Sequence, residues 1–313
     1  MKGKQGLVCM GLLLVLSSCS CHTGKQITAS GLQRKDFQTE VNGQHTDLFT
    51  LSNKQGMEVC ITNYGARVVS ILVPDRNGKR EDVVCGFSTI TEYMEQRQNF
   101  GSTVGRYIGR ILNARFTLDG VEYKLVPNNG KSGHISHGGN PGFADRIWKV
   151  EQADTHRVRL SYLSPDGENG FPGNLKVTLV YSLGEDDNAL DLTYEATTDA
   201  PTVLNLSHHS FFNISGNFTK SVEDQQLWVD ADRFTPYDDK KCVTGEYLPV
   251  AGTPLDFRMP HAIGECIDAD HPQLKVVNGY DHTWELNTKG DDTRPAAWVL
   301  SLIHISEPTR HSL

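Results

Sequence analysis

Positive charge is sparse and scattered in this 313-residue sequence. Its 30 Lys and Arg residues are outnumbered by 38 Asp and Glu residues, and the net charge is −8. A protein that binds a phosphate backbone usually presents a cluster of Lys and Arg. We therefore expect no nucleic-acid partner, and the charge balance favours a small neutral ligand.

The sequence also lacks an apolar run long enough to cross a bilayer. The run at residues 7–16 is too short to do so; it follows two lysines and precedes a Ser-Ser-Cys sequence that ends at Cys19. This arrangement is typical of a secretory signal peptide, and residues 16–19 resemble a bacterial lipobox. We predict a signal peptide over residues 1–18 and a lipidated Cys19. An ordinary secretory signal with a chance cysteine is the alternative.

Either interpretation places the body of the protein outside the cytosol. The lipid would anchor it to a bacterial membrane, on the periplasmic side or at the cell surface, and the membrane would be contacted only through that lipid. Residues 19–35 are polar and lack periodicity. We expect them to form a tether between the anchor and the body.

Paired cysteine motifs are absent as well. The sequence has seven cysteines but no CxxC pair, and removal of Cys9 and lipidation of Cys19 leave an odd number at irregular spacings. This pattern favours small buried apolar residues over a disulfide framework or a zinc site. The five remaining cysteines are Cys21, Cys60, Cys85, Cys242 and Cys266.

Helical periodicity is scarce, whereas alternation of apolar and polar residues is frequent. Residues 157–162, 176–183 and 190–196 alternate with a period of two. This period is typical of strands with one buried face. Residues 116–118 and 121–123 flank Asp-Gly, which predicts a tight antiparallel hairpin.

One short helix is predicted at residues 89–98. Thr89 would cap it, and Glu92 is placed to complete a capping box. The many strands and the lack of alternating helices favour an antiparallel sandwich over a parallel α/β fold. We therefore expect one all-β domain over residues 36–299.

A histidine pair interrupts an apolar strand pattern at residues 202–214. His208 and His209 lie there between Asn205 and Asn213. A buried imidazole needs hydrogen-bond partners, and its pKa can be tuned for proton transfer. A core histidine without chemistry and a catalytic histidine are about equally compatible with this local sequence.

Two further histidines flank glycines at residues 133–139. His134 and His137 lie in the sequence GHISHGG, where glycines allow the backbone to approach a ligand closely. Together with His208 and His209 they offer nitrogen ligands for a metal. No carboxylate completes a metal motif, so we favour a binding loop and expect no metal.

Charged residues mark two more candidate positions. Asp256 lies in the sequence GTPLDFR, where it can accept hydrogen bonds from sugar hydroxyls or form a salt bridge with Arg258. Arg106 and Arg110 are four residues apart, and on a strand both would lie on one face. Local sequence does not decide which arginine reaches a ligand.

Several segments, in order over residues 40–298, resemble the aldose 1-epimerase (mutarotase) family. A single match of this kind would be weak, whereas a series in family order is specific. The matching segments are NYGA at 63–66, GRYIGRI at 105–111, FTLDG at 116–120, HGG at 137–139, SPDGENGFPG at 164–173, residues 202–214, GTPLDFR at 252–258 and GYDH at 279–282.

The resemblance implies a galactose-mutarotase-like β-supersandwich that interconverts the α and β anomers of aldohexoses such as galactose and glucose, without a cofactor or metal. In the family a histidine protonates the ring oxygen and a glutamate removes the anomeric hydroxyl proton. By position, His209 takes the acid role and His137 assists in binding and proton sharing. Arg110 and Asp256 would hold sugar hydroxyls. Phe211 stands where the family usually has a tyrosine.

The sequence departs from the family pattern at a few of these positions. Gly109 replaces an asparagine before the arginine, which removes one expected hydroxyl contact. Beside the predicted acid, His208 replaces an asparagine and Ser207 replaces a threonine.

The segment 300–313 does not resemble the family. It reads like the translation of a sequencing-library adapter, and we expect it to be a non-native tail. The family's late segment with the catalytic glutamate is not matched, so the mutarotase domain would be incomplete, and Glu307 is not assigned as the base. A lipid-anchored carbohydrate-binding protein without catalysis is therefore the alternative to an isomerase.

Overall fold

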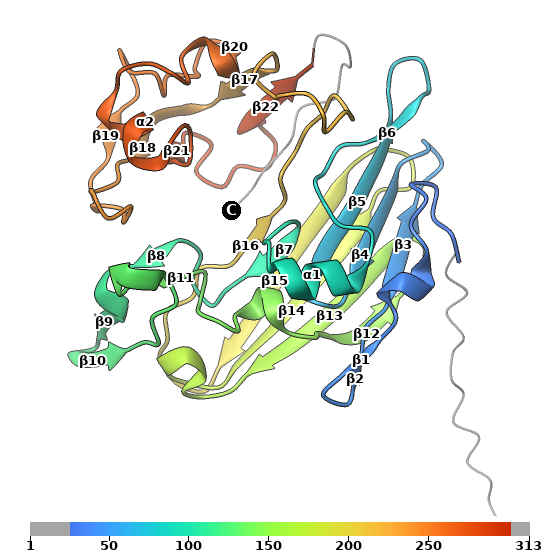
Figure 1. Cartoon of the computed structure of the whole chain (residues 1–313), viewed down its shortest axis with the longest axis horizontal. Helices are drawn as coiled ribbons and strands as arrows, with labels where there is room; N and C mark the ends of the chain where they lie inside the picture. The colour runs from blue at the N-terminus through green and yellow to red at the C-terminus, as the bar shows by residue number, and fades with distance from the viewer. Residues whose placement is uncertain (1–25, 302–313) are drawn as a thin grey trace, which may run out of the picture.

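The computed structural model describes residues 26–301. The predicted signal peptide, Cys19 and Glu307 lie outside the described residues. Within residues 26–301, no helix is long and apolar enough to cross a membrane. The chain is built mainly of antiparallel strands, which confirms the predicted all-β class (Figure 1).

The first of two large sheets has the strand order β3-β4-β5-β6. Both faces of β4 and of most of β5 are buried, which accounts for their nearly continuous apolar sequences. The bounds are β3 Leu48–Ser52, β4 Glu58–Thr62, β5 Arg67–Pro74 and β6 Arg80–Asp82.

The second large sheet has the order β12-β13-β14-β15 and contains the alternating segments predicted as strands. In β14 the inward residues Val177, Leu179 and Tyr181 are buried, whereas the inward residues of β15 are only half-buried. The bounds are β12 Lys149–Ala153, β13 Arg157–Ser164, β14 Leu175–Leu183 and β15 Leu190–Thr198.

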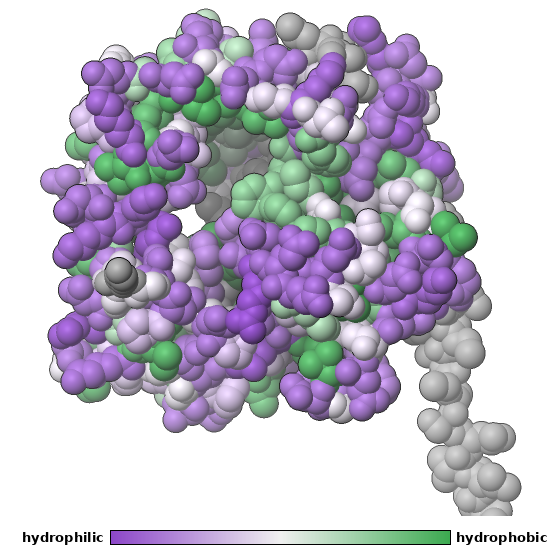
Figure 2. All heavy atoms as spheres, viewed as in Figure 1, coloured by the Kyte–Doolittle hydropathy of each residue, from purple (hydrophilic) through white to green (hydrophobic). Residues whose placement is uncertain are grey.

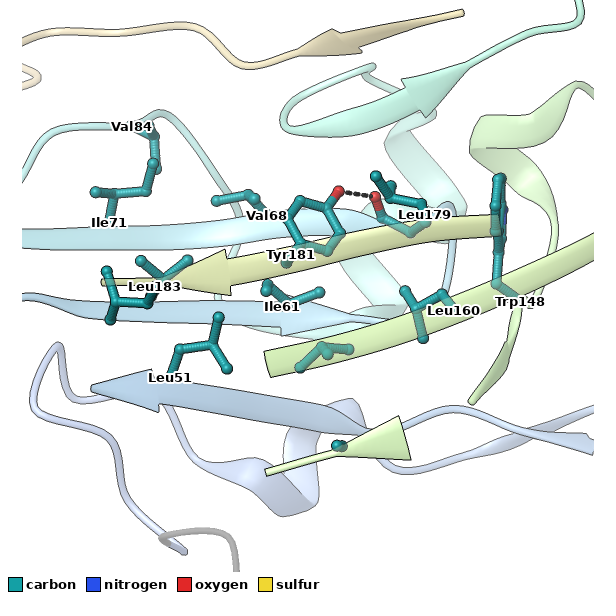
Figure 3. Packing of buried hydrophobic residues seen from close by; sticks show 14 of the residues in the cluster. Leu51, Ile61, Val68, Ile71, Val84, Trp148, Leu160, Leu179, Tyr181 and Leu183 are labelled. Atoms are coloured by element: carbon teal, nitrogen blue, oxygen red, sulfur yellow. Dashed lines mark hydrogen bonds between the residues drawn. The ribbon is translucent and has the colours of Figure 1, made fainter. Parts of the chain in front are cut away.

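The main hydrophobic core fills the space between these two sheets. Leu51 and Ile61 from the first sheet meet Leu160 and Leu179 from the second, and all four are at most 1% exposed (Figure 3). Tyr181 lies in the same core and donates its buried hydroxyl to the Ala66 carbonyl at 2.6 Å. The structure is therefore a sandwich, as predicted.

Helix α1 (Ile90–Gln96) packs on the outer face of the first sheet, where its Ile90 and Tyr93 join a second apolar cluster with Cys60 and Val69. The Thr89 side chain accepts a hydrogen bond from the Glu92 N–H, which confirms the predicted cap. The Glu92 carboxylate accepts from the Ser88 N–H and the Thr89 hydroxyl. The helix ends two residues before the predicted limit, and Arg97 follows in the left-handed region.

Residues 26–35, which we predicted as part of the tether, also pack against this sheet. Thr28 is buried, and the Ala29 N–H donates to the Glu58 carboxylate at 2.6 Å. Arg34 pairs with Asp47. The folded body therefore extends to the N-terminal side of residue 36, because this segment has polar partners that its composition did not reveal.

Short strand pairs connect and decorate the sandwich. The predicted hairpin is present: Asp119 and Gly120 both have positive φ and join β9 to β10. The pairs are β1 (Glu40–Val41) with β2 (Gln44–His45), β9 (Arg115–Leu118) with β10 (Val121–Lys124), β8 (Arg110–Ile111) with β11 (Ile135–Ser136), and β7 (Ser102–Val104) with β16 (Ser207–His209).

The C-terminal region, defined here as residues 217–301, forms two three-stranded sheets beside the sandwich (Figure 1). Their orders are β20-β17-β22 and β19-β18-β21, with α2 (Pro272–Val277) among them. The strand bounds are β17 Gln226–Val229, β18 Ala231–Thr235, β19 Leu248–Pro249, β20 His261–Ala262, β21 Thr283–Leu286 and β22 Ala297–Leu300.

Six short 3-10 turns complete the secondary structure of residues 26–301. They are η1 Arg34–Phe37, η2 Leu112–Ala114, η3 Gly130–Ser132, η4 Phe143–Asp145, η5 Glu168–Gly170 and η6 Ile263–Glu265.

Candidate functional site

The predicted acid, His209, is positioned by the short pair β7–β16. His208 lies opposite Thr103 and His209 lies opposite Ser102. Successive residues of a strand point to opposite faces. His208 accordingly approaches the core residue Tyr181, with ring centroids 6.1 Å apart, whereas His209 approaches His137.

His137 sits in a tight turn directly after β11. Its φ is +51°, a value that is uncommon for a residue other than glycine. A Cβ at Gly138 would lie 1.8 Å from the Gly105 carbonyl oxygen, and a Cβ at Gly139 would strike Asn169. The glycines therefore allow the close backbone approach that the GHISHGG sequence predicted.

The two histidines form an edge-to-face pair. Their ring centroids are 5.2 Å apart and the ring planes are perpendicular. The Gly109 N–H donates to His137 Nδ1 at 3.3 Å. In the neutral ring this leaves the proton on Nε2, which can then donate to a ligand.

Aromatic side chains border His209 on one side. The Phe211 ring lies 5.0 Å from the His209 ring, and Phe100 contacts Phe211 edge-to-face at 5.2 Å. Phe211 itself is 44% exposed. It thus offers a bare aromatic surface beside the histidine pair.

Burial and neighbouring charge tune both imidazoles toward the neutral form. Burial lowers the pKa of His137 to about 4, with further lowering by His209 and Arg110. Burial also lowers the pKa of His209, and Arg67 adds to this effect. The Asp281 carboxylate raises the pKa of His209 and so partly opposes these effects. A carboxylate and two cations thus set the proton affinity of one histidine pair.

The structure separates the two candidate arginines. Arg106 is 1% exposed, and its side chain donates to main-chain carbonyls of Ser164, Pro165, Pro172 and Gly173. Arg110 begins β8, acts electrostatically on His137, and donates to the Lys241 carbonyl at 3.0 Å. The expectation of one shared strand face is wrong, because Arg106 precedes β8 and lies in an irregular segment.

Asp256 lies in the C-terminal region and is paired with Arg258. Two hydrogen bonds of 2.8 Å join the guanidinium to the carboxylate, and Arg258 also contacts Asp232 at 3.0 Å. None of the described contacts of Asp256 is with His137 or His209. The salt bridge we considered is therefore present, while a role of Asp256 in holding a sugar hydroxyl stays a prediction.

A pocket with a volume of about 490 Å³ is lined by Asp256 and Arg258 and not by the histidines. A second hollow opens between the C-terminal region and the sandwich (Figure 2). Tyr237, from this region, donates its hydroxyl to the Asp281 carbonyl at 2.8 Å. Lys241, Tyr237 and Asp281 therefore bring the C-terminal region toward Arg110 and His209.

The remaining histidine of the metal alternative lies elsewhere. His134 is fully buried and its Nδ1 accepts from the Asn113 N–H at 3.0 Å. Within residues 26–301, no three His, Cys, Asp or Glu side chains are grouped to hold a metal ion. In the same part of the chain Cys60, Cys85, Cys242 and Cys266 are free thiols, and Cys60 and Cys242 are buried.

Three residues near the pair were missed by sequence reasoning: Arg67, Phe100 and Tyr237. Asp281 lies in the GYDH segment, but its position there gave no role. A charged residue at the start of the apolar stretch RVVSILVP was the available signal for Arg67. Phe100 and Tyr237 gave no signal, because only the tertiary structure brings them near His209.

Comparison with known proteins places this geometry in a broader context. The family described as Aldose 1-epimerase matches residues 47–305. The chain is 38% identical over 236 residues to galactose mutarotase of Sus scrofa. This match covers 75% of this chain and 66% of that protein. It is 37% identical over 260 residues to aldose 1-epimerase of Escherichia coli K12, with coverages of 83% and 74%.

A solved structure shares the same fold. The galactose 1-epimerase of Lactobacillus acidophilus NCFM superposes with a TM-score of 0.74 at 31% identity. The match covers 84% of this chain and 76% of that one. The chain therefore spans about two thirds to three quarters of the length of these relatives.

Proposed function

Because this chain belongs to the aldose 1-epimerase family, we propose that it is an isomerase that interconverts the α and β anomers of aldohexoses such as galactose and glucose. The observation that carries the proposal is the edge-to-face pair of His137 and His209, with lowered pKa values, beside an exposed aromatic ring. Acid–base chemistry requires titratable groups of this kind held in a fixed geometry.

The reaction needs only proton transfers and one bond rotation. His209, in its protonated imidazolium form, donates a proton to the ring oxygen and becomes neutral. At the same time a base removes the proton of the anomeric hydroxyl, so that the C1–O5 bond breaks and an aldehyde forms. Rotation about C1–C2 presents either face of the aldehyde to the C5 hydroxyl. Reclosure reverses both proton transfers, and no cofactor or metal is consumed.

The other site residues would bind the sugar. His137, neutral at physiological pH, donates from Nε2 to a hydroxyl and shares protons with the ring that it faces. Arg110, which acts electrostatically on His137, donates to another hydroxyl. Asp256 accepts from another hydroxyl, exchanging one of its Arg258 contacts for the ligand. Phe211 packs on an apolar face of the ring.

Among residues 26–301 we assign no general base, since the family resemblance gives that role to a glutamate in a late segment. Export and lipid anchoring at Cys19 are part of the same proposal; they rest on the N-terminal sequence alone.

Polarimetry tests the proposed activity. Freshly dissolved α-D-galactose or α-D-glucose should reach its equilibrium rotation much faster with the protein than in buffer alone, at a rate proportional to protein concentration. Saturable sugar binding without any acceleration would contradict the isomerase and favour the carbohydrate-binding protein. Heat-denatured protein is the matched control.

A further inference from the structure

Arg67 is a buried cation that acts electrostatically on His209. It begins β5, is 1% exposed, and has no carboxylate within salt-bridge distance among the described residues. Its guanidinium carbon lies 4.6 Å from the Tyr93 ring centroid and 5.8 Å from that of Tyr64. A buried charge is retained in such a place only when it is well bound.

The guanidinium binds two separate loops through their main chain. Nη1 donates to the carbonyls of Gln98 and Phe100 at 2.8 and 2.7 Å. Nη2 donates to the carbonyl of Ala144 at 3.0 Å. The planar guanidinium, with donors in a fixed fork, is well suited to hold two loops in this way.

The first loop supports His209. The Phe100 ring packs on Phe211, and Phe211 packs on His209. The next residue, Gly101, donates its N–H to the His209 carbonyl at 3.0 Å and accepts from the Val68 N–H at 2.8 Å. A Cβ at Gly101 would lie 1.8 Å from the Val68 carbonyl oxygen, so this loop has little freedom to move.

The second loop supports His137. Ala144 lies in η4, which follows the His137 turn. A Cβ at Gly142, just before η4, would lie 3.0 Å from the His137 carbonyl oxygen, so the start of η4 packs directly on that turn. On its other side, Gly65 is so close that a Cβ there would lie 2.4 Å from the Ala144 oxygen.

We propose that Arg67 is a positioning residue of the site: its buried guanidinium fixes the two loops that carry and support His137 and His209, and so sets the distance and angle between the two rings. This role goes beyond the proposed function, because it concerns a residue that does not touch the sugar. The kinetic part of its test rests on that function.

The charge of Arg67 supplies a second, electrostatic contribution. His209 faces the His137 ring, and it is influenced by the Asp281 carboxylate from the C-terminal region and by the Arg67 guanidinium. Arg110 acts on His137. Arg67 and burial lower the pKa of His209, whereas Asp281 raises it. Removing the cation therefore raises the pKa of His209.

Two substitutions separate geometry from charge. R67M removes both the fork and the charge, while R67K keeps the charge and loses the fork. R34K is the control, since Arg34 is also largely buried but binds the Asp47 carboxylate rather than either of the two loops. In sugar-free protein, two-dimensional NMR gives the His209 titration and the nuclear Overhauser effect between the His137 and His209 rings.

The expected results differ for each variant. R67M weakens the ring-to-ring effect and raises the pKa of His209. R67K weakens the ring-to-ring effect and leaves the His209 titration unchanged. If R67M does not fold, R67K alone still tests whether the fork positions the two rings. Both lower kcat for mutarotation by about ten- to a hundredfold, the scale of a small displacement of a catalytic group, with little change in KM. R34K leaves the His209 titration and kcat unchanged.

An unaltered ring-to-ring effect in folded R67K would overturn the proposal, as would R34K producing the same changes. Wild-type protein without mutarotase activity would remove the proposed function instead. The NMR comparison would still decide the role of Arg67, because it does not depend on turnover.

Discussion

The sandwich and the C-terminal region are stabilised in different ways. Between its two sheets the sandwich has a single core of many fully buried side chains, of which Leu160 and Leu179 are examples. The C-terminal region has two small clusters, around Phe257 and around Leu255. Its surface carries several exposed ion pairs, such as that of Arg258 with Asp232.

The two regions also contribute different kinds of residue to the candidate site. His137 and His209 are held by strands and turns that pack on the sandwich, where displacement is costly. Asp256 and Asp281 come from the less densely packed region. The proposed proton-transfer groups thus lie on the sandwich, whereas Asp281 and the proposed sugar ligand Asp256 lie on the part with the smaller core.

The largest expected effect is on stability, from matched leucine truncations. Leu179→Ala should lower the free energy of unfolding by about 3–4 kcal/mol, and Leu255→Ala by about 2 kcal/mol, because a smaller cluster collapses more readily around the cavity. Guanidinium unfolding followed by circular dichroism and by tryptophan fluorescence measures both. Three of the four tryptophans, Trp228, Trp284 and Trp298, lie in the C-terminal region.

The two probes sharpen the comparison. Leu179→Ala should shift both unfolding midpoints, whereas Leu255→Ala should shift the fluorescence midpoint more than the circular dichroism midpoint. Equal shifts of both midpoints in Leu255→Ala would mean that the C-terminal region unfolds together with the sandwich as one cooperative unit.

A smaller effect is expected from pH. Burial lowers the pKa of His137 in the site and of His282 in the C-terminal region from 6.5 to about 4. Between pH 4 and pH 6.5 the unfolded chain therefore binds more protons than the folded one, so stability falls as pH falls through this window. Each group contributes at most about 1.4 kcal/mol per pH unit.

Glutamine substitutions assign the two contributions. His137→Gln and His282→Gln should each flatten the pH dependence of the unfolding free energy between pH 4 and pH 6.5, and His282→Gln should do so chiefly in the fluorescence signal. His156→Gln, at an exposed turn, is the control. If the unfolding free energy still depends on pH to the same extent in both variants, these two buried histidines are not the cause of the pH dependence.

Much of the fold could be predicted from the sequence. Alternation marked β13, β14 and β15, Asp119-Gly120 marked the hairpin, and Thr89 marked the start of α1. These features are local, so a short window contains the physical cause. The packing of residues 26–35 was missed because their partners, such as Glu58, are distant in sequence.

The site was predicted in part, for the same reason. His137, His209, Phe211 and Arg110 lie together, as the family resemblance implied. The different directions of His208 and His209 follow from the strand period. That Arg106 is buried in a carbonyl network, and that Arg67 supports both histidines, depends on long-range contacts that no local pattern encodes.

The central claim is that the histidine pair on the sandwich carries the proton transfer. Its most direct test is polarimetry of α-D-galactose with the His209→Ala variant of the full chain, with His156→Ala as control. The account predicts a rate lower by about a hundredfold or more for His209→Ala, as expected when a positioned acid is lost, and an unchanged rate for the control. A near-normal rate in folded His209→Ala would contradict it and remove His209 from the acid role.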